Sequence, residues 1–208
     1  MFLAIETLYP RVLDQPVIAP FLQSNLKSQN LELFVTEFKT RIKDIYVQDW
    51  HDSLINSTRA SFYRVYKQSF KYSSYLDIVF VKSHRDALTR LLSSSHILHV
   101  ESGRWRRNPE LPRERRYCFI CTAKVEDEYH FVFECPIYRS LRIQLIPRYY
   151  RERPSMFKFI SLLNTTNKKH IIALAKFVYK AFAERRLFIS GNIIHRVLDI
   201  RSYMPQYL

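Results

Sequence analysis

The stretch "RRYCFICTAKVEDEYHFVFECP", residues 115–136, contains all three cysteines of this 208-residue chain. Cys118, Cys121 and Cys135 are joined there by His130, in the spacing Cys-x2-Cys-x8-His-x4-Cys. Two cysteines separated by two residues can turn both thiols toward one point. The loops that follow can then return an imidazole and a third thiol to the same point. The segment therefore has the spacing of a small metal-binding module.

Zinc prefers four soft or borderline donors in a tetrahedron, and three thiolates with one neutral imidazole complete that set. We therefore predict one Zn²⁺ bound by Cys118, Cys121, His130 and Cys135. Such a site has no open position for a substrate, so it is predicted to be structural. The alternative is that the cysteines are small core residues and that His130 is a satisfied surface histidine.

The loop before His130 contains three consecutive acidic residues, Glu126, Asp127 and Glu128. We interpret them as a solvated loop tip and not as oxygen ligands, because the sulfur and nitrogen donors already number four.

Composition restricts the fold and the compartment. Hydrophobic residues make up 47% of the chain, enough for a real core. The only glycines, Gly103 and Gly191, argue against a sheet-rich fold and against a glycine-rich phosphate loop. Three cysteines cannot all pair within the chain, which favours a reducing, intracellular location, nuclear or cytoplasmic. The N-terminus does not have the pattern of a signal peptide, and no apolar run is long enough to span a membrane.

The apolar pattern predicts mostly helices. A helical stripe covers residues 31–46, further helices follow Ser57 and cover 83–93, and a helix runs from Pro136 to about Ile146. Ser155 and Asn167 are predicted to cap helices that extend through residue 163 and to about residue 186. Residues 75–81 are ambiguous between a short buried strand and an extended linker.

The predicted fold is therefore mainly α, a helical domain with a small irregular zinc-knuckle-like module inserted near the middle. The expected segments are a loosely structured N-terminal segment (1–30), a helical region (31–101), a basic linker (102–116), the zinc-binding-like module (117–146), C-terminal helices (147–190) and a tail (191–208).

The net charge of +14 is unevenly distributed. Residues 1–103 contain 12 Lys and Arg against 10 Asp and Glu, whereas residues 104–208 contain 21 against 9, a net of +12. A concentrated positive field predicts a polyanionic partner, but the charge by itself does not separate nucleic acid from an acidic membrane surface. Nucleic acid, and not a membrane, is the partner that we expect.

Arginines interleaved with aromatic residues are the candidate contacts with nucleic acid. Guanidinium groups bind phosphate in a forked geometry, and an aromatic ring can stack on an exposed base. The alternative for the first group is that Trp105 packs on the core while its neighbouring arginines are solvated. The candidates are Arg104, Trp105, Arg106 and Arg107, followed by Arg139, Arg142, Arg148, Arg151 and Arg153.

Several segments together resemble the C-terminal region of animal non-LTR (LINE-type) retrotransposon reverse transcriptase polyproteins. They include "QDWHDSL", "HRDALTRLLSSSHILHVESGRW", "CFIC…EDEYHFVFECPIYRSLR" and "RPSMFKFISLLN". The resemblance covers about residues 31–186 and is most specific in the Cys/His segment. It implies Cys118, Cys121, His130 and Cys135 as zinc ligands, and a role near template RNA or target DNA. It also implies the rest of the polyprotein as a partner.

The catalytic motifs of such a polyprotein are not found in the sequence. "YLDI" offers a single aspartate, Asp77, whereas two-metal phosphoryl chemistry needs paired carboxylates. We therefore predict a non-enzymatic tail that binds RNA or single-stranded or target DNA. The alternatives are a helical protein-interaction module stabilised by zinc, and a decayed element fragment without present function.

Overall fold

The computed structural model describes residues 31–58, 61–105 and 110–190. The segments expected at 1–30 and 191–208 lie outside these residues. The chain divides into two compact units, 1–57 and 58–208. In the described part of the first unit, helix α4 (Leu31–Asn56) continues past the predicted end at residue 46. Phe34 and Phe38 are buried on it, with their rings stacked at 6.2 Å.

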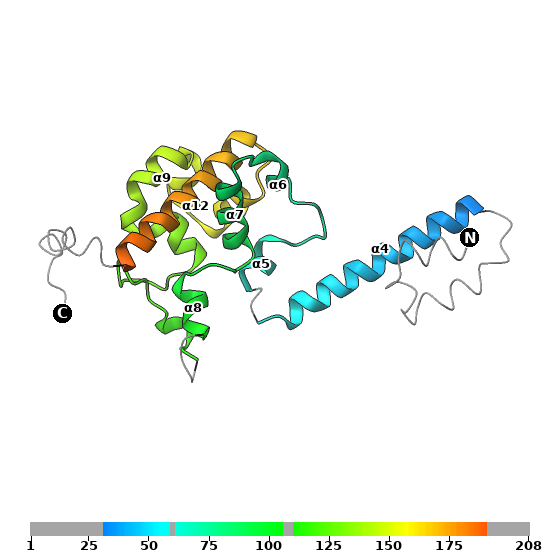
Figure 1. Ribbon diagram of the computed structural model, residues 1–208, viewed down its shortest axis with the longest axis horizontal. Coiled ribbons are helices and arrows are strands. Elements are labelled where there is room, and N and C mark those ends of the chain that lie inside the picture. Colours follow the sequence, from blue (N-terminus) through cyan, green and yellow to red (C-terminus); the bar gives the residue numbers. More distant parts are fainter. Residues whose placement is uncertain (1–30, 59–60, 106–109, 191–208) are drawn as a thin grey trace, which may run out of the picture. The chain divides into compact units, whose positions relative to one another are not determined.

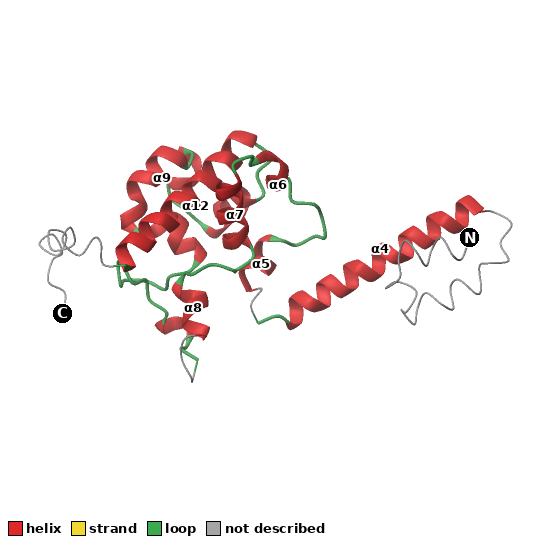
Figure 2. Cartoon of the chain, viewed as in Figure 1, coloured by secondary structure: helices red, strands yellow, loops and turns green. Residues whose placement is uncertain are grey.

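The second unit contains the site and is helical throughout its described part, apart from loops and one isolated β-bridge (Figure 2). The predicted fold class, a mainly α domain with a small irregular Cys/His module near its middle, is confirmed. Its elements are α5 (Ser61–Tyr66), α6 (Tyr75–Ile78), α7 (Lys82–Leu92), α8 (His99–Trp105), η1 (Arg113–Arg115), η2 (His130–Glu134), η3 (Pro136–Tyr138), α9 (Arg139–Leu145), α10 (Arg148–Arg151), α11 (Met156–Leu163) and α12 (Lys168–Ile189).

Helix α12 is the centre of the second unit. It packs against α7 and α9, and Figure 1 shows it running between them. Ile171, Leu174, Ala175 and Val178 are buried on one side of it, at the spacing of a single helical face. Phe177 meets Phe131 from the Cys/His segment, with ring centroids 6.3 Å apart. The Cys/His segment is therefore part of the same core as the helices.

The predicted caps of the last two helices are confirmed. The Ser155 hydroxyl accepts a hydrogen bond from the amide of Lys158 (3.3 Å), and the side chain of Asn167 accepts one from the amide of Lys169 (3.0 Å). Each cap satisfies one of the amides that a helix start leaves without an intrahelical partner. The sequence therefore located both helix starts, and α12 ends three residues beyond the expected Arg186.

Two local predictions were wrong. Residues 75–78 form helix α6, neither a strand nor an extended linker. Residues 102–105, expected to begin a basic linker, continue helix α8. Gly103 allows this packing, because a Cβ at that position would lie 3.0 Å from Cγ and Cδ of the buried Arg116.

None of the helices in the described ranges has the length and apolar character needed to cross a bilayer.

Candidate metal centre

The four residues selected from the sequence converge in the structure. The ligand atoms of Cys118, Cys121, His130 and Cys135 all lie within 4.8 Å of one another. All four side chains are buried, and the three cysteines are free. The alternative in which His130 sits at the surface is wrong, since this residue is 3% exposed.

The distances fit a tetrahedral ion. A Zn–S bond of about 2.3 Å puts two thiolates of a tetrahedron about 3.8 Å apart. Here Cys118 Sγ lies 3.9 Å from Cys135 Sγ, and Cys121 Sγ lies 3.3 Å from His130 Nε2. The cluster could therefore hold a metal ion after only small shifts of its side chains.

A tight turn places the first two cysteines. The amide of Cys118 donates to the carbonyl of Lys124 (2.8 Å), and the amide of Thr122 donates to the carbonyl of Cys118 (2.9 Å). An isolated bridge between Tyr117 and Val125 closes the base of the turn. Thr122 has a φ of 56°, a left-handed conformation that costs energy for a β-branched residue. The backbone from Cys118 to Val125 therefore forms one tight turn, the knuckle, which brings the thiols of Cys118 and Cys121 to the same side.

A π-helical turn places the other two ligands. The amide of Cys135 donates to the carbonyl of His130 (2.8 Å), a bond across five residues that defines the π turn of η2. This bond returns the chain to the same side of the turn after four intervening residues, which explains the His-x4-Cys spacing. At its start, Asp127 Oδ1 accepts from the amide of His130 (2.8 Å).

Polar groups outside the cluster hold its ligands. Glu134 Oε2 lies 3.4 Å from His130 Nδ1, leaving Nε2 to face the thiols, and Lys124 binds the other oxygen of the same carboxylate at 2.7 Å. A carboxylate on the remote nitrogen is the usual partner of a metal-bound histidine, because it fixes the ring and its tautomer.

Arg142 holds the backbone of the same turn. It is 7% exposed, and its guanidinium donates to the carbonyls of Val132 (3.0 Å) and Cys135 (2.7 Å). Arg142 was predicted to contact phosphate as part of a basic stripe, and its burial corrects this prediction. Its guanidinium points inward and binds the backbone of η2.

The cluster favours negative charge on one of its three sulfurs, that of Cys118. A hydrogen bond from Cys135 lowers the pKa of the Cys118 thiol far below its ordinary value, whereas burial raises the pKa of Cys121, and the hydrogen bond to Cys118 together with burial raises the pKa of Cys135. Burial acts to lower the pKa of His130, but its contacts with the Cys118 sulfur and with Glu134 outweigh this effect and raise it. A thiolate is the form of cysteine that binds metal. The geometry therefore already stabilises part of the charge that a cation would require.

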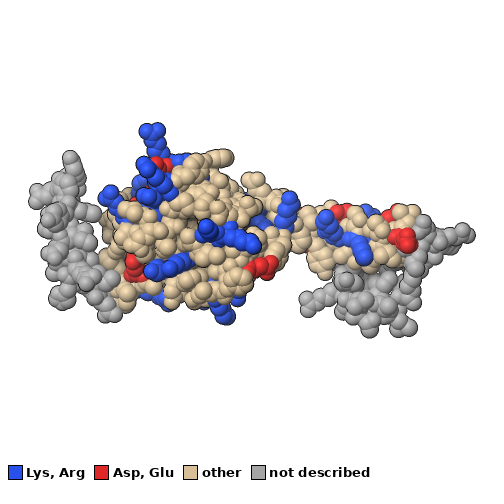
Figure 3. Space-filling model, turned by 90° about the horizontal axis from the view of Figure 1, so that it is seen from above, with Lys and Arg blue, Asp and Glu red and all other residues tan. Residues whose placement is uncertain are grey.

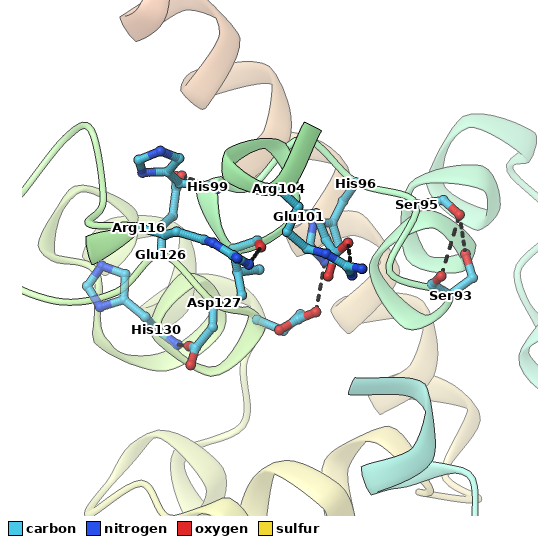
Figure 4. A network of polar contacts seen from close by, with 12 residues as sticks. Ser93, Ser95, His96, His99, Glu101, Arg104, Arg116, Glu126, Asp127 and His130 are labelled. Carbon is cyan, nitrogen blue, oxygen red and sulfur yellow. Dashed lines mark hydrogen bonds and ion pairs between the residues drawn. The ribbon is translucent and has the colours of Figure 1, made fainter. Parts of the chain in front are cut away.

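A buried ion pair connects this centre to α12. Both oxygens of Glu126 accept from Arg185, at 2.6 Å from Nε and 2.7 Å from Nη2. Glu126 Oε1 also lies 4.0 Å from Cys118 Sγ, and Oε2 accepts from the amide of His99 (2.7 Å). The ion pair is therefore in contact with a metal-ligand candidate at one end and with the central helix at the other. Figure 4 shows Glu126 together with His99, Asp127 and His130.

The prediction of a solvated acidic loop tip is wrong. Glu126 is 1% exposed, and Glu128 is buried against His96, with 2.9 Å between Oε1 and Nε2. Asp127 is the most accessible of the three and caps the π turn. The sequence contained a signal for Arg185, the partner of Glu126. Arg185 lies four residues after Ala181 and seven after Val178, which are both buried, so it falls on the apolar stripe of its helix.

Of the predicted contacts at the end of α8, the structure describes the side chain of Arg104. Arg104 is paired with Glu101 (3.3 Å) and donates to the carbonyl of Thr58 (2.7 Å). Burial raises the pKa of Glu101, against the opposing effect of Arg104. Arg106, Arg107 and the side chain of Trp105 lie outside the described part of the structure.

Among the later candidates, Arg139, Arg148 and Arg153 are exposed, and Arg151 is half-buried. Arg148 begins α10, and Arg153 lies in the turn between α10 and α11. Each of these helices exposes an aromatic ring, Tyr149 (59%) on α10 and Phe157 (75%) on α11. Lys158 Nζ lies 4.8 Å from the centroid of the Tyr149 ring. We call Arg148, Tyr149, Arg153, Phe157 and Lys158 the α10–α11 surface.

The chain as a whole was also compared with known proteins. No protein-family model matches it, and no curated protein and no solved structure matches it either. The case for a function therefore comes from the residues and from their geometry.

Proposed function

We propose that the chain binds one structural Zn²⁺ at Cys118, Cys121, His130 and Cys135. The support is the burial of all four donors and the spacing of their ligand atoms. Three thiolates and one imidazole are a frequent donor set of closed zinc sites. When bound, the ion would cross-link the knuckle to the π turn, and Glu134 and Arg142 would hold the ligands in place.

We further propose that the second unit is a non-catalytic module that binds single-stranded nucleic acid, RNA or DNA. The resemblance to the C-terminal region of non-LTR reverse transcriptases agrees with this role and suggests the rest of such a polyprotein as a partner. It also suggests an intracellular location, in the nucleus or the cytoplasm. A single aspartate in "YLDI" supports the absence of catalysis, and Asp77 accepts a hydrogen bond from Tyr72 (2.7 Å).

The observation that carries the proposal is the α10–α11 surface. Large aromatic rings are usually buried, yet Tyr149 and Phe157 are more than half exposed, and each is next to a basic residue in the sequence. Exposed rings beside cations suit single-stranded nucleic acid, because bases stack on the rings while the cations bind phosphate. Figure 3 shows one face of the molecule, on which Lys and Arg side chains outnumber Asp and Glu side chains among the described residues.

Binding of a fluorescent single-stranded RNA and of a DNA of the same sequence tests the proposal. Tyr149→Ala and Phe157→Ala should each weaken binding by about 1–3 kcal/mol if the ring stacks on a base. Phe80→Ala is the matched control, because Phe80 is 86% exposed on the α6–α7 loop and is not part of the α10–α11 surface. Equal affinities for the wild type and for all three variants would refute the assignment of this surface.

A second candidate function is a protein-interaction module, and one observation favours it. A cavity of about 960 Å³ opens beside the end of α12, lined by Ile97, Phe119, Leu187 and Ile189 among others. Phe119 lies between the first two cysteines and is half exposed. An apolar surface of this kind is typical of protein contacts. Phe119→Asp would abolish such a contact and leave nucleic-acid affinity unchanged, and a pull-down assay and a binding titration on the same variant separate the two functions.

A further inference from the structure

A second cavity lies apart from the metal centre. It has a volume of about 570 Å³ and is lined by the loop between α5 and α6, the turn between α11 and α12, and parts of α7 and α12. None of the four metal-ligand candidates lines it. Sites for small molecules are typically about 300–1,000 Å³. The cavity is therefore large enough for a ligand of the size of a mononucleotide.

One wall of this cavity is apolar. Leu88, Leu92, Leu162 and Leu174 all line it and are all at most 3% exposed as residues, so they present a fixed surface from three helices. Asn164 closes one end, since its side-chain amide donates to the carbonyl of Tyr66 (3.3 Å). A packed apolar wall of this kind suits the flat face of a ring.

The other wall is polar and carries positive charge. Lys67 and Lys71 both line the cavity, together with serine and threonine hydroxyls from its two connecting segments. Lys67 Nζ donates to the Ser73 hydroxyl (2.9 Å), which uses one of the three donors of an ammonium group. Burial lowers the pKa of Lys67, as expected for a cation that has lost water without gaining a carboxylate.

The lining contains no carboxylate among its described residues. Asp77 lies nearby on α6, but its side chain accepts the hydrogen bond of the Tyr72 hydroxyl at 2.7 Å. Lys71 is exposed and forms no ion pair within the described ranges. Two lysines thus face one cavity without a compensating acid, and an anion is the ligand that would neutralise them.

We propose that this cavity binds a phosphorylated ligand of nucleotide size, with its phosphate at Lys67 and Lys71 and its ring against the leucine wall. Lysine is a common ligand of phosphate, which it binds as a point charge. The ligand could be a free nucleotide or the phosphorylated end of a strand, because both present the same phosphate and ring. This site goes beyond the α10–α11 surface and does not depend on the binding of zinc.

The test is to titrate the full chain with AMP, with adenosine and with inorganic phosphate. The amide shifts in NMR spectra of the protein measure the binding of each compound. AMP should bind saturably and more tightly than either fragment, with shifts at residues 67–74 and 162–166. The variant Lys67→Gln/Lys71→Gln should weaken AMP binding by about tenfold or more, a loss of about 1.4 kcal/mol or more, because it removes both charged donors to the phosphate. Lys82→Gln is the matched control, because Lys82 is paired with Asp86 and does not line the cavity.

Three results would overturn the proposal. The first is that the wild type does not bind AMP saturably. The second is that the double variant and the control lose the same amount of affinity for AMP, and the third is that inorganic phosphate binds as tightly as AMP. A thermal melt of the double variant verifies that it is folded. Tyr149→Ala should leave AMP binding unchanged, so failure of the strand-binding surface is distinguishable from failure of this site.

Two oligonucleotides of one sequence, with and without a 5′-phosphate, identify the source of the ligand. A preference for the phosphorylated strand that disappears in the double variant assigns the cavity to strand ends. Equal binding of the two strands, together with saturable binding of AMP, assigns it to free nucleotides.

Discussion

The knuckle region, residues 113–135, and the α10–α11 region, residues 147–158, are both rich in charged and aromatic residues. In the first region, Glu126 is buried in an ion pair, Glu128 is buried against His96, and Phe131 is 1% exposed. In the second, Arg148 and Glu152 form an ion pair in solvent, and Phe157 is 75% exposed. The same residue types therefore hold the fold together in one region and remain available to a partner in the other. A count of charges in the sequence does not distinguish these two roles.

The largest expected effect is the loss of the proposed zinc ion. Zinc contributes about 10 kcal/mol or more to the folding of small zinc modules at neutral pH, because the site does not exist in the unfolded chain. Cys135→Ser should therefore lose the ion and unfold the knuckle region first, while α7 and α12 stay helical. Zinc content by atomic absorption and amide shifts by NMR measure the two effects.

Chelation of zinc from the wild-type protein is the control for this variant. It should reproduce the same local unfolding, since the missing ion is the shared cause. An unchanged NMR spectrum after complete removal of zinc would contradict the structural role of the ion.

The second effect compares two ion pairs, one from each region. Arg185→Met leaves Glu126 buried without its partner and should lower the free energy of unfolding by about 3–5 kcal/mol. Arg148→Met breaks the exposed pair with Glu152 and should change it by about 0–1 kcal/mol. Urea denaturation followed by circular dichroism measures both values.

A double variant separates the cost of an unpaired charge from that of lost packing. Glu126→Gln/Arg185→Met should recover part of the stability that Arg185→Met loses, because no buried charge is left unpaired. If Arg185→Met is as mild as Arg148→Met, the contrast between the two regions does not hold.

The third effect is at α9, where a buried and an exposed arginine lie on one helix. Arg142→Gln removes hydrogen bonds to the carbonyls of Val132 and Cys135, which should lower the free energy of unfolding by about 1.5–3 kcal/mol. It should also weaken zinc binding by about 10–100-fold, because it releases the turn that carries two ligands. Competition with a chromophoric chelator measures zinc affinity.

Arg139→Gln is the matched control, three residues away and exposed. Its stability should stay within about 0.5 kcal/mol of the wild type. Similar zinc affinities for the two variants would show that Arg142 does not support the metal centre.

The smallest effect on stability is expected in the α10–α11 region. The property measured there is the affinity for single-stranded nucleic acid. Arg148→Gln/Arg153→Gln should leave the melting temperature nearly unchanged. It should flatten the slope of log K against log salt by about 1.4 for a single strand, since each phosphate contact contributes about 0.7. A slope equal to that of the wild type would mean that neither arginine contacts phosphate.

The sequence by itself determined the features that depend on neighbours along the chain. Ser155 and Asn167 start their helices because a side-chain oxygen can reach an amide two or three residues ahead. The Cys-x2-Cys and His-x4-Cys spacings similarly selected the four residues that converge, since one knuckle and one π turn fix each pair locally. The apolar stripe of α12 followed from helical periodicity alone.

The tertiary structure decided which charges are internal. Glu126 and Arg185 are 59 residues apart in sequence, so no local pattern pairs them, and only the packing of α12 against the knuckle brings them to 2.6 Å. Arg142 and Arg139 look alike in the sequence, yet one faces the π turn and the other faces solvent. A charged side chain is stable inside a protein only where another element supplies its partners. The position of that element is a property of the whole fold.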